Sequence, residues 1–453
     1  MSAEAVKRSS RHLRGTVAAA LAEPTPAFEH DDVAVLKFHG IYQQDDRDTR
    51  RQRTRAGEEL DHSCMVRVGL PGGRLDTEQW LALDRLADVV GSDSLRITTR
   101  QGIQFHGVLK PHLRPLLRDI AANELSTFAA CGDVVRNVMA SPAPLGGVLD
   151  SIQDLAGRIA AHFRPHTTAY AEVWLDDEPA LSVEPATHEP IYGDAYLPRK
   201  FKIGIAAPGE NSVDVLTHDL GIVPNVVDGA IASFTLAIGG GMGRSHNRPD
   251  THPRLGSWFA DVEPDDLLEV IEAIVVFQRD HGDREDRKQA RLKYVVDRLG
   301  LDVVRRGVEA IVGRSLDAPT PHTFPATDDH LGWHRAADGS WFLGVHVPSG
   351  RVRDIEGSAY RTGLRALVER FGPELRCTPQ QNLLLCGLGE SDRGEVDALL
   401  VDHGIPLVEQ LTPLTRAALA CPALPTCGQA LGEAERAMPD ILDIVDGVLT
   451  SLD

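Results

Sequence analysis

The chain has 453 residues, of which 42% are hydrophobic and 25% are charged, and its formal net charge is −19 at pH 7. These proportions are those of a globular protein of two or three domains and exclude a disordered chain. The acidic balance argues against general nucleic-acid binding, and six scattered cysteines exclude a secreted disulfide scaffold.

The N-terminal segment lacks the pattern of a secretion signal. Basic residues from Lys7 to Arg14 precede an apolar run at 17–22, which is shorter than the core of a signal peptide. No later stretch approaches the roughly eighteen apolar residues of a membrane span. The sequence therefore predicts a soluble, cytoplasmic protein.

A strand, a helix and a further strand are predicted between residues 64 and 107. Residues 65–74 begin as a strand. Asp76 and Gln79 then have the pattern of a capping box, and Gly91 closes the helix. The apolar face of this helix is formed by Leu83, Leu86, Ala87 and Val90. The segment 95–107 supplies the next strand.

Basic residues recur at the ends of predicted strands. They are Arg67, Arg96, Arg100, Arg136, Arg199, Lys200 and Lys202. An acidic protein that gathers guanidinium and ammonium groups in this way is expected to build an anion site. The alternative is that each is a surface charge or part of a local ion pair. His106 is predicted to be a strand histidine near this site and not a ligand.

Two segments of the middle region carry weaker signals. An apolar strand at 232–238 leads into Gly239-Gly-Gly-Met-Gly243, which lacks the spacing of a nucleotide-binding fingerprint and favours close backbone approach to a flat ligand or an anion. Residues 283–293 have the pattern of a charged helix with a solvated face; carboxylate binding is the alternative for this run. Residues 318–325 are predicted to be a linker.

The first strand–helix–strand pattern recurs later in the chain. Residues 342–351 repeat 65–74, a second amphipathic helix ends at Gly372, and 375–387 repeat 95–107 with matching Leu, Arg, Thr, Gln and Gly. A fold alone does not require the matched Arg and Gln. The pattern therefore predicts two α+β halves around a pseudo-twofold axis, against the alternative of chance similarity.

Two cysteines near the C-terminus form half of a metal site. Cys421 and Cys427 can bind one edge of an iron–sulfur cluster, but a 4Fe-4S cluster normally takes four thiolates. Cys377 and Cys386 lie in a strand-like segment and are predicted to be buried thiols. The tail 430–448 is predicted to be helical, with Pro439 starting a new helix.

Several of these segments together resemble the siroheme sulfite and nitrite reductase family, and within it the hemoprotein subunits of assimilatory sulfite reductases. The resemblance runs from about residue 33 to the end. It rests on Leu36–Asp48, Leu70–Gly73, Thr98–Gln101, Pro198–Lys202, Gly239–Gly241 and Cys421-x5-Cys427. The stretch Phe38–Asp46 is more similar to the sulfite branch than to the nitrite branch.

The resemblance implies an α+β fold: a pseudo-twofold repeat of ferredoxin-like halves with an inserted α/β domain and an incomplete C-terminal cluster-binding domain. The expected divisions are an N-terminal arm packing with the C-terminal domain (1–63), the first half (64–129), the inserted siroheme-binding domain (130–325), the second half (326–405) and the start of the cluster-binding domain (406–453).

The resemblance also implies siroheme joined to a 4Fe-4S cluster and six-electron reduction of sulfite to sulfide in sulfate assimilation and cysteine biosynthesis. The substrate anion is expected at Arg67, Arg136, Lys200 and Lys202, with the lysines as acid donors. Siroheme is expected at Arg96, Thr98, Arg100, Gln104, Arg199, Gly239, Gly240, Gly241 and Arg291, and the cluster at Cys421 and Cys427. The electron donor is expected to be an NADPH-dependent flavoprotein subunit or a ferredoxin.

The chain departs from the family because a second cysteine pair, spaced C-x3-C, is absent from it. We therefore expect a truncated gene product or a complementary C-terminal polypeptide, exposed apolar surface on 406–453, and no stable cluster on this chain alone. The alternatives are a siroheme nitrite reductase, which forms ammonia, and a non-catalytic siroheme- or anion-binding fragment.

Overall fold

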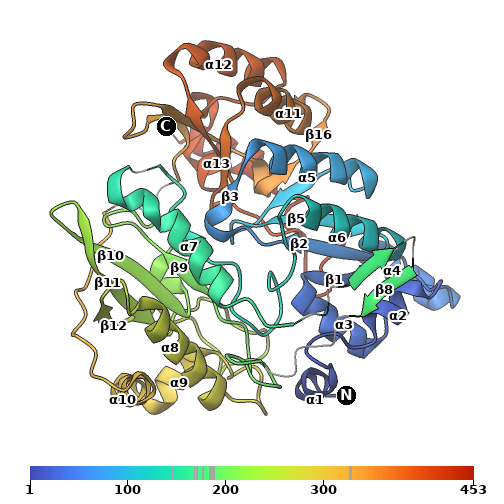
Figure 1. The fold of residues 1–453 in the computed structure, drawn as a ribbon. Coiled ribbons are helices and arrows are strands. Elements are labelled where there is room, and N and C mark those ends of the chain that lie inside the picture. Colours follow the sequence, from blue (N-terminus) through green and yellow to red (C-terminus); the bar gives the residue numbers. More distant parts are fainter. Residues whose placement is uncertain are drawn as a thin grey trace.

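The computed structural model describes residues 1–453 except 145, 168, 170–171, 176–177, 183–188, 326–328 and 453. Within these residues the chain forms two α+β halves and a middle body, each built on a five-stranded sheet (Figure 1). In the described part of the chain, no helix is both long and apolar enough to cross a membrane.

The sheet of the first half has the strand order β1-β2-β5-β4-β15. Its strands are β1 (Ile41–Asp45), β2 (His62–Val68), β5 (Ile103–Val108), β4 (Leu95–Ile97) and β15 (Arg351–Val352). Its helices are α5 (Thr77–Val89) and α6 (Leu113–Ala122). The predicted capping box is confirmed, because Asp76 accepts from the backbone of Gln79 while the Gln79 side chain accepts from the backbone of Asp76.

The second half repeats this arrangement with the order β13-β14-β19-β18-β3. Its strands are β13 (Gly332–Arg335), β14 (Trp341–Val345), β19 (Leu383–Leu388), β18 (Glu374–Cys377) and β3 (Arg74–Leu75). Its helices are α11 (Tyr360–Phe371), which ends at Gly372 as predicted, and α12 (Arg393–Asp402). The predicted repeat of two α+β halves is confirmed.

Each half also contributes an edge strand to the sheet of the other half. β15 follows β14 in sequence but pairs with β4, placing Arg351 opposite Arg96. β3 follows β2 but pairs with β18, placing Arg376 opposite Arg74. The sequence repeat did not predict this exchange, since it specifies the order of elements and not their partners.

Two glutamines connect the halves where the exchanged segments meet. The Gln101 amide donates to the carbonyl of Cys377 (3.0 Å), and the Gln381 amide donates to the carbonyl of Ile97 (3.1 Å), the equivalent position of the other half. A Cβ atom on Gly73 would lie 2.4 Å from the Cys377 carbonyl oxygen, so this close approach requires glycine. Gln101 and Gln381 therefore link the two halves by reciprocal hydrogen bonds, and we call this pair of contacts the glutamine interlock.

Helices α5 and α11 add an ion pair across the same boundary. Arg361 Nε contacts Asp84 Oδ1 at 2.6 Å, and Arg365 contacts the other oxygen of Asp84. The Asp84 side chain is 2% exposed. A buried carboxylate paired with two guanidinium groups fixes how the two helices sit against each other.

The middle body has the sheet order β12-β11-β10-β9-β6, with β9 parallel to both β10 and β6. Its strands are β6 (Met139–Ala140), β9 (Ile203–Ile205), β10 (Leu220–Val227), β11 (Ala230–Ile238) and β12 (Ser257–Val262), and a separate hairpin is formed by β7 (Glu172–Leu175) and β8 (Glu178–Ser182). Its helices are α7 (Ser151–His162), α8 (Leu267–His281), α9 (Leu292–Leu299) and α10 (Leu301–Val312). This body agrees with an inserted α/β unit.

The prediction of a charged helix over 283–293 is wrong. The described segment 283–291 is irregular and α9 begins only at Leu292, because the Asp283 carboxylate accepts from the backbone N–H groups of Glu285 and Asp286 and so holds a turn. The arginines of this segment bind protein carboxylates: Arg287 lies 2.8 Å from Asp133. Part of the run therefore binds protein carboxylates, while Lys288 is exposed as expected for a solvated face.

The N-terminal segment contacts both the middle body and the C-terminal tail. It contains α1 (Ala3–Ser9), α2 (Val17–Ala22), α3 (His30–Leu36) and α4 (Arg47–Ala56). Buried Lys7 donates to the Leu197 carbonyl at 2.8 Å, and Arg47 donates to the Cys427 carbonyl at 2.8 Å. The domain limits themselves stay a prediction.

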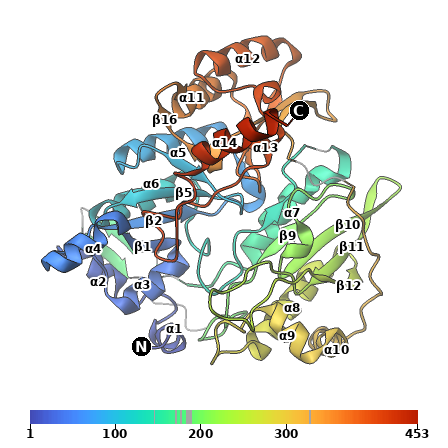
Figure 2. The ribbon, with the colours of Figure 1, turned by 180° about the vertical axis from the view of Figure 1, so that it is seen from behind.

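The C-terminal tail contains α13 (Pro413–Ala417) and α14 (Met438–Thr450). Figure 2 shows this red segment running beside β5 and β2 between the two helices. Residues 430–437 are not helical, contrary to the predicted start, but Pro439 does lie in the first turn of α14. Ile444 and Val448 of α14 are 67% and 54% exposed, so this helix presents an apolar face, as expected for 406–453.

We expect Gln101→Ala to destabilise the fold. Fully buried Gln101 also donates to the carbonyls of Gly72 and Ala140 and accepts from the N–H of Ala140, so its removal leaves several buried backbone groups unpaired. The expected loss in the free energy of unfolding is about 3 kcal/mol, measured by urea unfolding. Exposed Gln52→Ala is the control; equal midpoints for the two variants would contradict the interlock.

Candidate functional site

The turn between β4 and β5 carries Arg100 toward the middle body. The Thr98 hydroxyl accepts from the N–H groups of Arg100 (3.2 Å) and Gly102 (3.1 Å), which fixes the turn. Arg100 then donates to the Ile203 carbonyl at 2.8 Å, and its Nη1 lies 3.3 Å from His218 Nδ1. Burial, and then neighbouring cations, lower the pKa of Arg100 to about 9.

Arg67 and Arg136 border one loop at the start of the middle body. Arg67, on β2, donates to Cys131 Sγ at 3.1 Å. Arg136 donates to the carbonyls of Gly132 (2.7 Å) and Ala130 (3.0 Å). The loop therefore holds two guanidinium groups that are distant in the sequence.

Lys200 and Lys202 precede β9 and face the same group of cations. Burial, and then Arg136, Arg291 and Arg199, lower the pKa of Lys200 to about 7. Burial also brings the pKa of Lys202 well below its ordinary value, followed by the effects of Arg100 and Lys200. The structure thus brings the predicted basic residues within electrostatic reach of one another.

Asp219 lies among these cations and was missed by the sequence analysis. Its carboxylate accepts from Arg291 Nε (3.1 Å) and Nη2 (2.8 Å) and from the backbone N–H of Lys202 (2.9 Å). Burial opposes the charge on Arg291, but the contact with Asp219 outweighs it and raises the pKa of Arg291. The only sequence signal was a single acid directly before the buried strand β10.

The glycine segment 239–243 packs against Arg291. A Cβ atom on Gly240 would lie 2.2 Å from the Leu216 carbonyl oxygen, and one on Gly241 would lie 2.5 Å from Arg291 Nη1. Buried Lys293 donates to the carbonyls of Gly241 (3.0 Å) and Gly243 (2.9 Å). The glycines at 240 and 241 therefore allow close approach of protein groups; contact with a ligand stays a prediction.

Arg96 connects the first half to the cysteine loop. It donates to Gln104 Oε1 (3.3 Å) and to the Ala420 carbonyl (2.8 Å), and its Nε lies 3.4 Å from Glu435 Oε2. Glu435 also binds Arg351 at 2.7 Å and was not identified from the sequence. Arg96 and Gln104 thus lie beside the turn that carries the two cysteines.

Arg199 and His106 are the remaining predicted residues, and each lies near arginines of the basic site. Burial lowers the pKa of Arg199, which faces Arg136, while Asp133 raises it. His106 is on β5, as predicted, with Nε2 3.4 Å from Gln104 Oε1. Burial and then nearby arginines hold the pKa of His106 well below its ordinary value, so the ring is neutral at pH 7.

The cysteines divide into two classes by exposure. Cys421 is exposed and Cys427 is half-buried, and the N–H of Cys427 donates to the Ala423 carbonyl (2.8 Å) in the turn between them. The other four are buried, as predicted for Cys377 and Cys386. Burial raises the pKa of Cys64, Cys377 and Cys386 to about 12, which keeps these thiols protonated.

The cysteine thiols and the arginine donors can be compared with what a 4Fe-4S cluster and siroheme require. The described residues contain no group of three or more His, Cys, Asp or Glu side chains able to hold a metal, so the Cys421–Cys427 turn offers two of the four thiolates that a 4Fe-4S cluster takes. Arg67 Nε and Arg100 Nε are buried with no hydrogen-bond partner among the described residues. Unpaired guanidinium donors in a basic cluster fit the carboxylates of siroheme.

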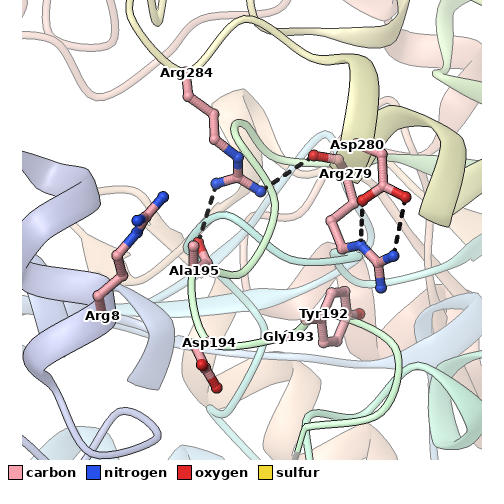
Figure 3. A pocket seen from close by; sticks show the side chains of 8 residues that line it. All are labelled: Arg8, Tyr192, Gly193, Asp194, Ala195, Arg279, Asp280 and Arg284. Carbon is pink, nitrogen blue, oxygen red and sulfur yellow. Dashed lines mark hydrogen bonds and ion pairs between the residues drawn. The ribbon is translucent and has the colours of Figure 1, made fainter.

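A pocket of about 510 Å³ elsewhere in the molecule does not coincide with these residues. Figure 3 shows two of its arginines bound to protein groups: Arg279 binds Asp280 at 2.7 Å, and Arg284 donates to the carbonyl of Arg279 at 3.2 Å. Arg8 reaches the pocket from α1. None of the residues predicted for substrate or cofactor lines this pocket.

Comparison with family profiles gives two matches. The nitrite/sulfite reductase ferredoxin-like half domain matches twice, at residues 56–123 and 334–403, which are the two repeated halves. The nitrite and sulphite reductase 4Fe-4S domain matches residues 155–316, within the middle body.

Individual proteins match nearly the whole chain. The sulfite reductase [NADPH] hemoprotein beta-component of Geobacillus kaustophilus is 42% identical over 98% of this chain and 78% of its own length. That of Acidithiobacillus ferrooxidans is 45% identical over 99% of this chain and 79% of its own. The comparisons do not support the expected complementary polypeptide.

A solved structure, that of the Mycobacterium tuberculosis NirA protein, has the same fold. It superposes with a TM-score of 0.77 at 23% identity, over 99% of this chain and 77% of that one. The two half-domain matches, the match in the middle body and the relatives at 42% and 45% identity agree, and the chain belongs to the nitrite and sulfite reductase family.

Proposed function

We propose that this chain is the hemoprotein component of an assimilatory sulfite reductase, which uses siroheme and a 4Fe-4S cluster to reduce sulfite to sulfide with six electrons. The observation that carries the proposal is the convergence of Arg67, Arg136, Lys200 and Lys202 from separate segments onto one basic cluster. The names of relatives at 42% and 45% identity support it. We place this activity in sulfur assimilation in the cytoplasm.

Siroheme would be held by arginines of both bodies. Arg100 and Arg199 face the basic cluster, while Arg96, Thr98 and Gln104 approach from the first half and Arg291 from the start of α9. When bound, siroheme would supply the iron centre at which sulfite is reduced. Bidentate guanidinium groups suit its carboxylates because both partners are planar and oppositely charged.

The chain's own cations would bind and orient the substrate. Sulfite is a dianion, and Arg67 and Arg136 would offset its charge while holding its oxygen atoms. With a pKa of about 7, Lys200 is divided between charged and neutral forms near neutral pH and can release a proton to an oxygen leaving as water. Lys202 is the second acid: an anion beside it would raise its lowered pKa and so bring in a proton.

Electrons would come from a flavoprotein partner. The relatives are named for NADPH, which favours an NADPH-dependent flavoprotein over a ferredoxin. Cys421 and Cys427 would provide two thiolates to the cluster that receives these electrons. Turnover of sulfite and nitrite by the same holoenzyme preparation separates the proposal from nitrite reduction, and an iron and acid-labile sulfide assay separates both from a non-catalytic fragment.

We expect Lys200→Met in the holoenzyme to reduce sulfite turnover by at least 100-fold, because it removes a proton donor. Siroheme content, measured by its visible absorbance, should stay close to that of the unchanged enzyme. Lys202→Met should behave in the same way, and exposed Lys288→Met is the control. Parallel loss of siroheme and turnover would instead identify the lysines as cofactor anchors.

The lowered pKa of Lys200 also predicts how stability varies with pH. Its pKa falls from the ordinary value of 10.5 to about 7 on folding, so the charged form favours the unfolded chain. The free-energy cost of burying the charged ammonium is therefore full below pH 7 and disappears as the pH rises to 10.5. Lys200→Met should therefore raise the urea midpoint more at pH 7 than at pH 10.

Exposed Lys288→Met is again the matched control, and it should change the midpoint little at either pH. An equal gain for Lys200→Met at both pH values would show that Lys200 titrates normally in the folded chain.

A further inference from the structure

We infer that Asp219 is a positioning residue of the basic site, one that holds Arg291 and the Lys200–Lys202 segment in register and gives the cluster a fixed negative charge. The inference rests on the proposed function only in taking this cluster to be the anion site. Asp219 has no place among the residues that the family resemblance assigned to substrate or cofactor.

Asp219 joins three segments of the middle body, two through its carboxylate and one through its backbone carbonyl. The Asp219 carboxylate is completely buried and binds Arg291 through both oxygens, at 3.1 and 2.8 Å. Its Oδ2 also accepts from the N–H of Lys202, directly before β9. The Asp219 carbonyl accepts from the N–H of Gly239 at 2.9 Å, at the start of the glycine segment. The segments before β9, after β11 and before α9 thus meet at Asp219.

The backbone around Asp219 strengthens this connection. The N–H of Leu220 donates to the Lys202 carbonyl at 3.1 Å, so Asp219 and Leu220 together bind both sides of the Lys202 backbone. Arg291 also donates to the Gly240 carbonyl at 3.1 Å. A shift of the Asp219 carboxylate would therefore move the lysine segment, the glycine segment and Arg291 together.

Asp219 also offsets the positive charges that surround the two lysines. Lys200 faces Arg136, Arg291 and Arg199, and Lys202 faces Arg100, Lys200 and Arg291. Asp219 is the carboxylate that faces both lysines and raises the pKa of each. Several cations packed together in a partly buried site repel one another, so a central anion reduces the cost of keeping them there.

The test is the titration of Lys200 in the full-length chain. Lysine ¹³C resonances are followed by NMR across pH, with the Lys200 signal assigned by its loss in Lys200→Met. Asp219→Asn keeps the size and one acceptor of the side chain but removes its charge. We expect the Lys200 midpoint to fall by about 1 pH unit, because an opposite charge nearby stabilises the ammonium.

The matched control is Asp84→Asn, which removes another buried carboxylate that binds two arginines, far from the lysines in the α5–α11 boundary. This variant should lose stability without moving the Lys200 midpoint. Asp219→Glu, which restores the charge, should return the midpoint toward that of the unchanged chain. If the shift were a general structural effect, Asp84→Asn and Asp219→Asn would change the Lys200 midpoint equally. That result would overturn the inference.

A second variant applies if Asp219→Asn does not fold. Arg291→Gln keeps a donor toward Asp219 and removes a cation, so the Lys200 midpoint should rise; an unchanged midpoint overturns the inference. Sulfite turnover by the unchanged holoenzyme is measured separately. Absence of turnover with the expected NMR shifts rejects the proposed function alone, and turnover without those shifts rejects the role of Asp219 alone.

Discussion

The reciprocal hydrogen bonds by which Gln101 binds the Cys377 carbonyl and Gln381 binds the Ile97 carbonyl are the constraint on which the rest of the structure depends. Each glutamine satisfies carbonyl groups in the opposite half, at points where the two backbones approach so closely that a side chain on Gly73 would not fit. The turn that buries Gln101 also carries Arg100 in the other direction, toward β9. The same few residues therefore close the boundary between the halves and aim a guanidinium group into the basic site.

The two halves share a backbone plan but differ in chemistry. In the first half, Arg67 lies opposite Gln104 across β2 and β5. The equivalent pair across β14 and β19 is Gly344 and Leu384, and Leu384 is completely buried in a small apolar cluster with Cys386. A group of cations is costly to keep together, and one copy is enough for a single anion. The second half thus serves as support for the site that the first half helps to form.

The sequence predicted what depends on local pattern or on repetition. The capping box of α5, the apolar strand at 232–238 (β11) and the duplicated strand–helix–strand order were all correct, since each is encoded within a short stretch or in two similar ones. Partners distant in the chain were not predictable in this way. Nothing near Asp219 indicates Arg291, and nothing near Glu435 indicates Arg96 and Arg351. The helix predicted over 283–293 was wrong because arginines of this segment bind distant carboxylates and because its backbone turns at Asp283.

The reciprocal strands β3 and β15 also limit what evolution can do with this duplication. Each half contributes an edge strand to the other sheet, so a gene split between the halves would encode two unfinished sheets with open edges. Both copies must therefore stay in one chain for either sheet to be complete. Within that limit their side chains are free to differ, as they do between the polar pair Arg67–Gln104 and the pair Gly344–Leu384.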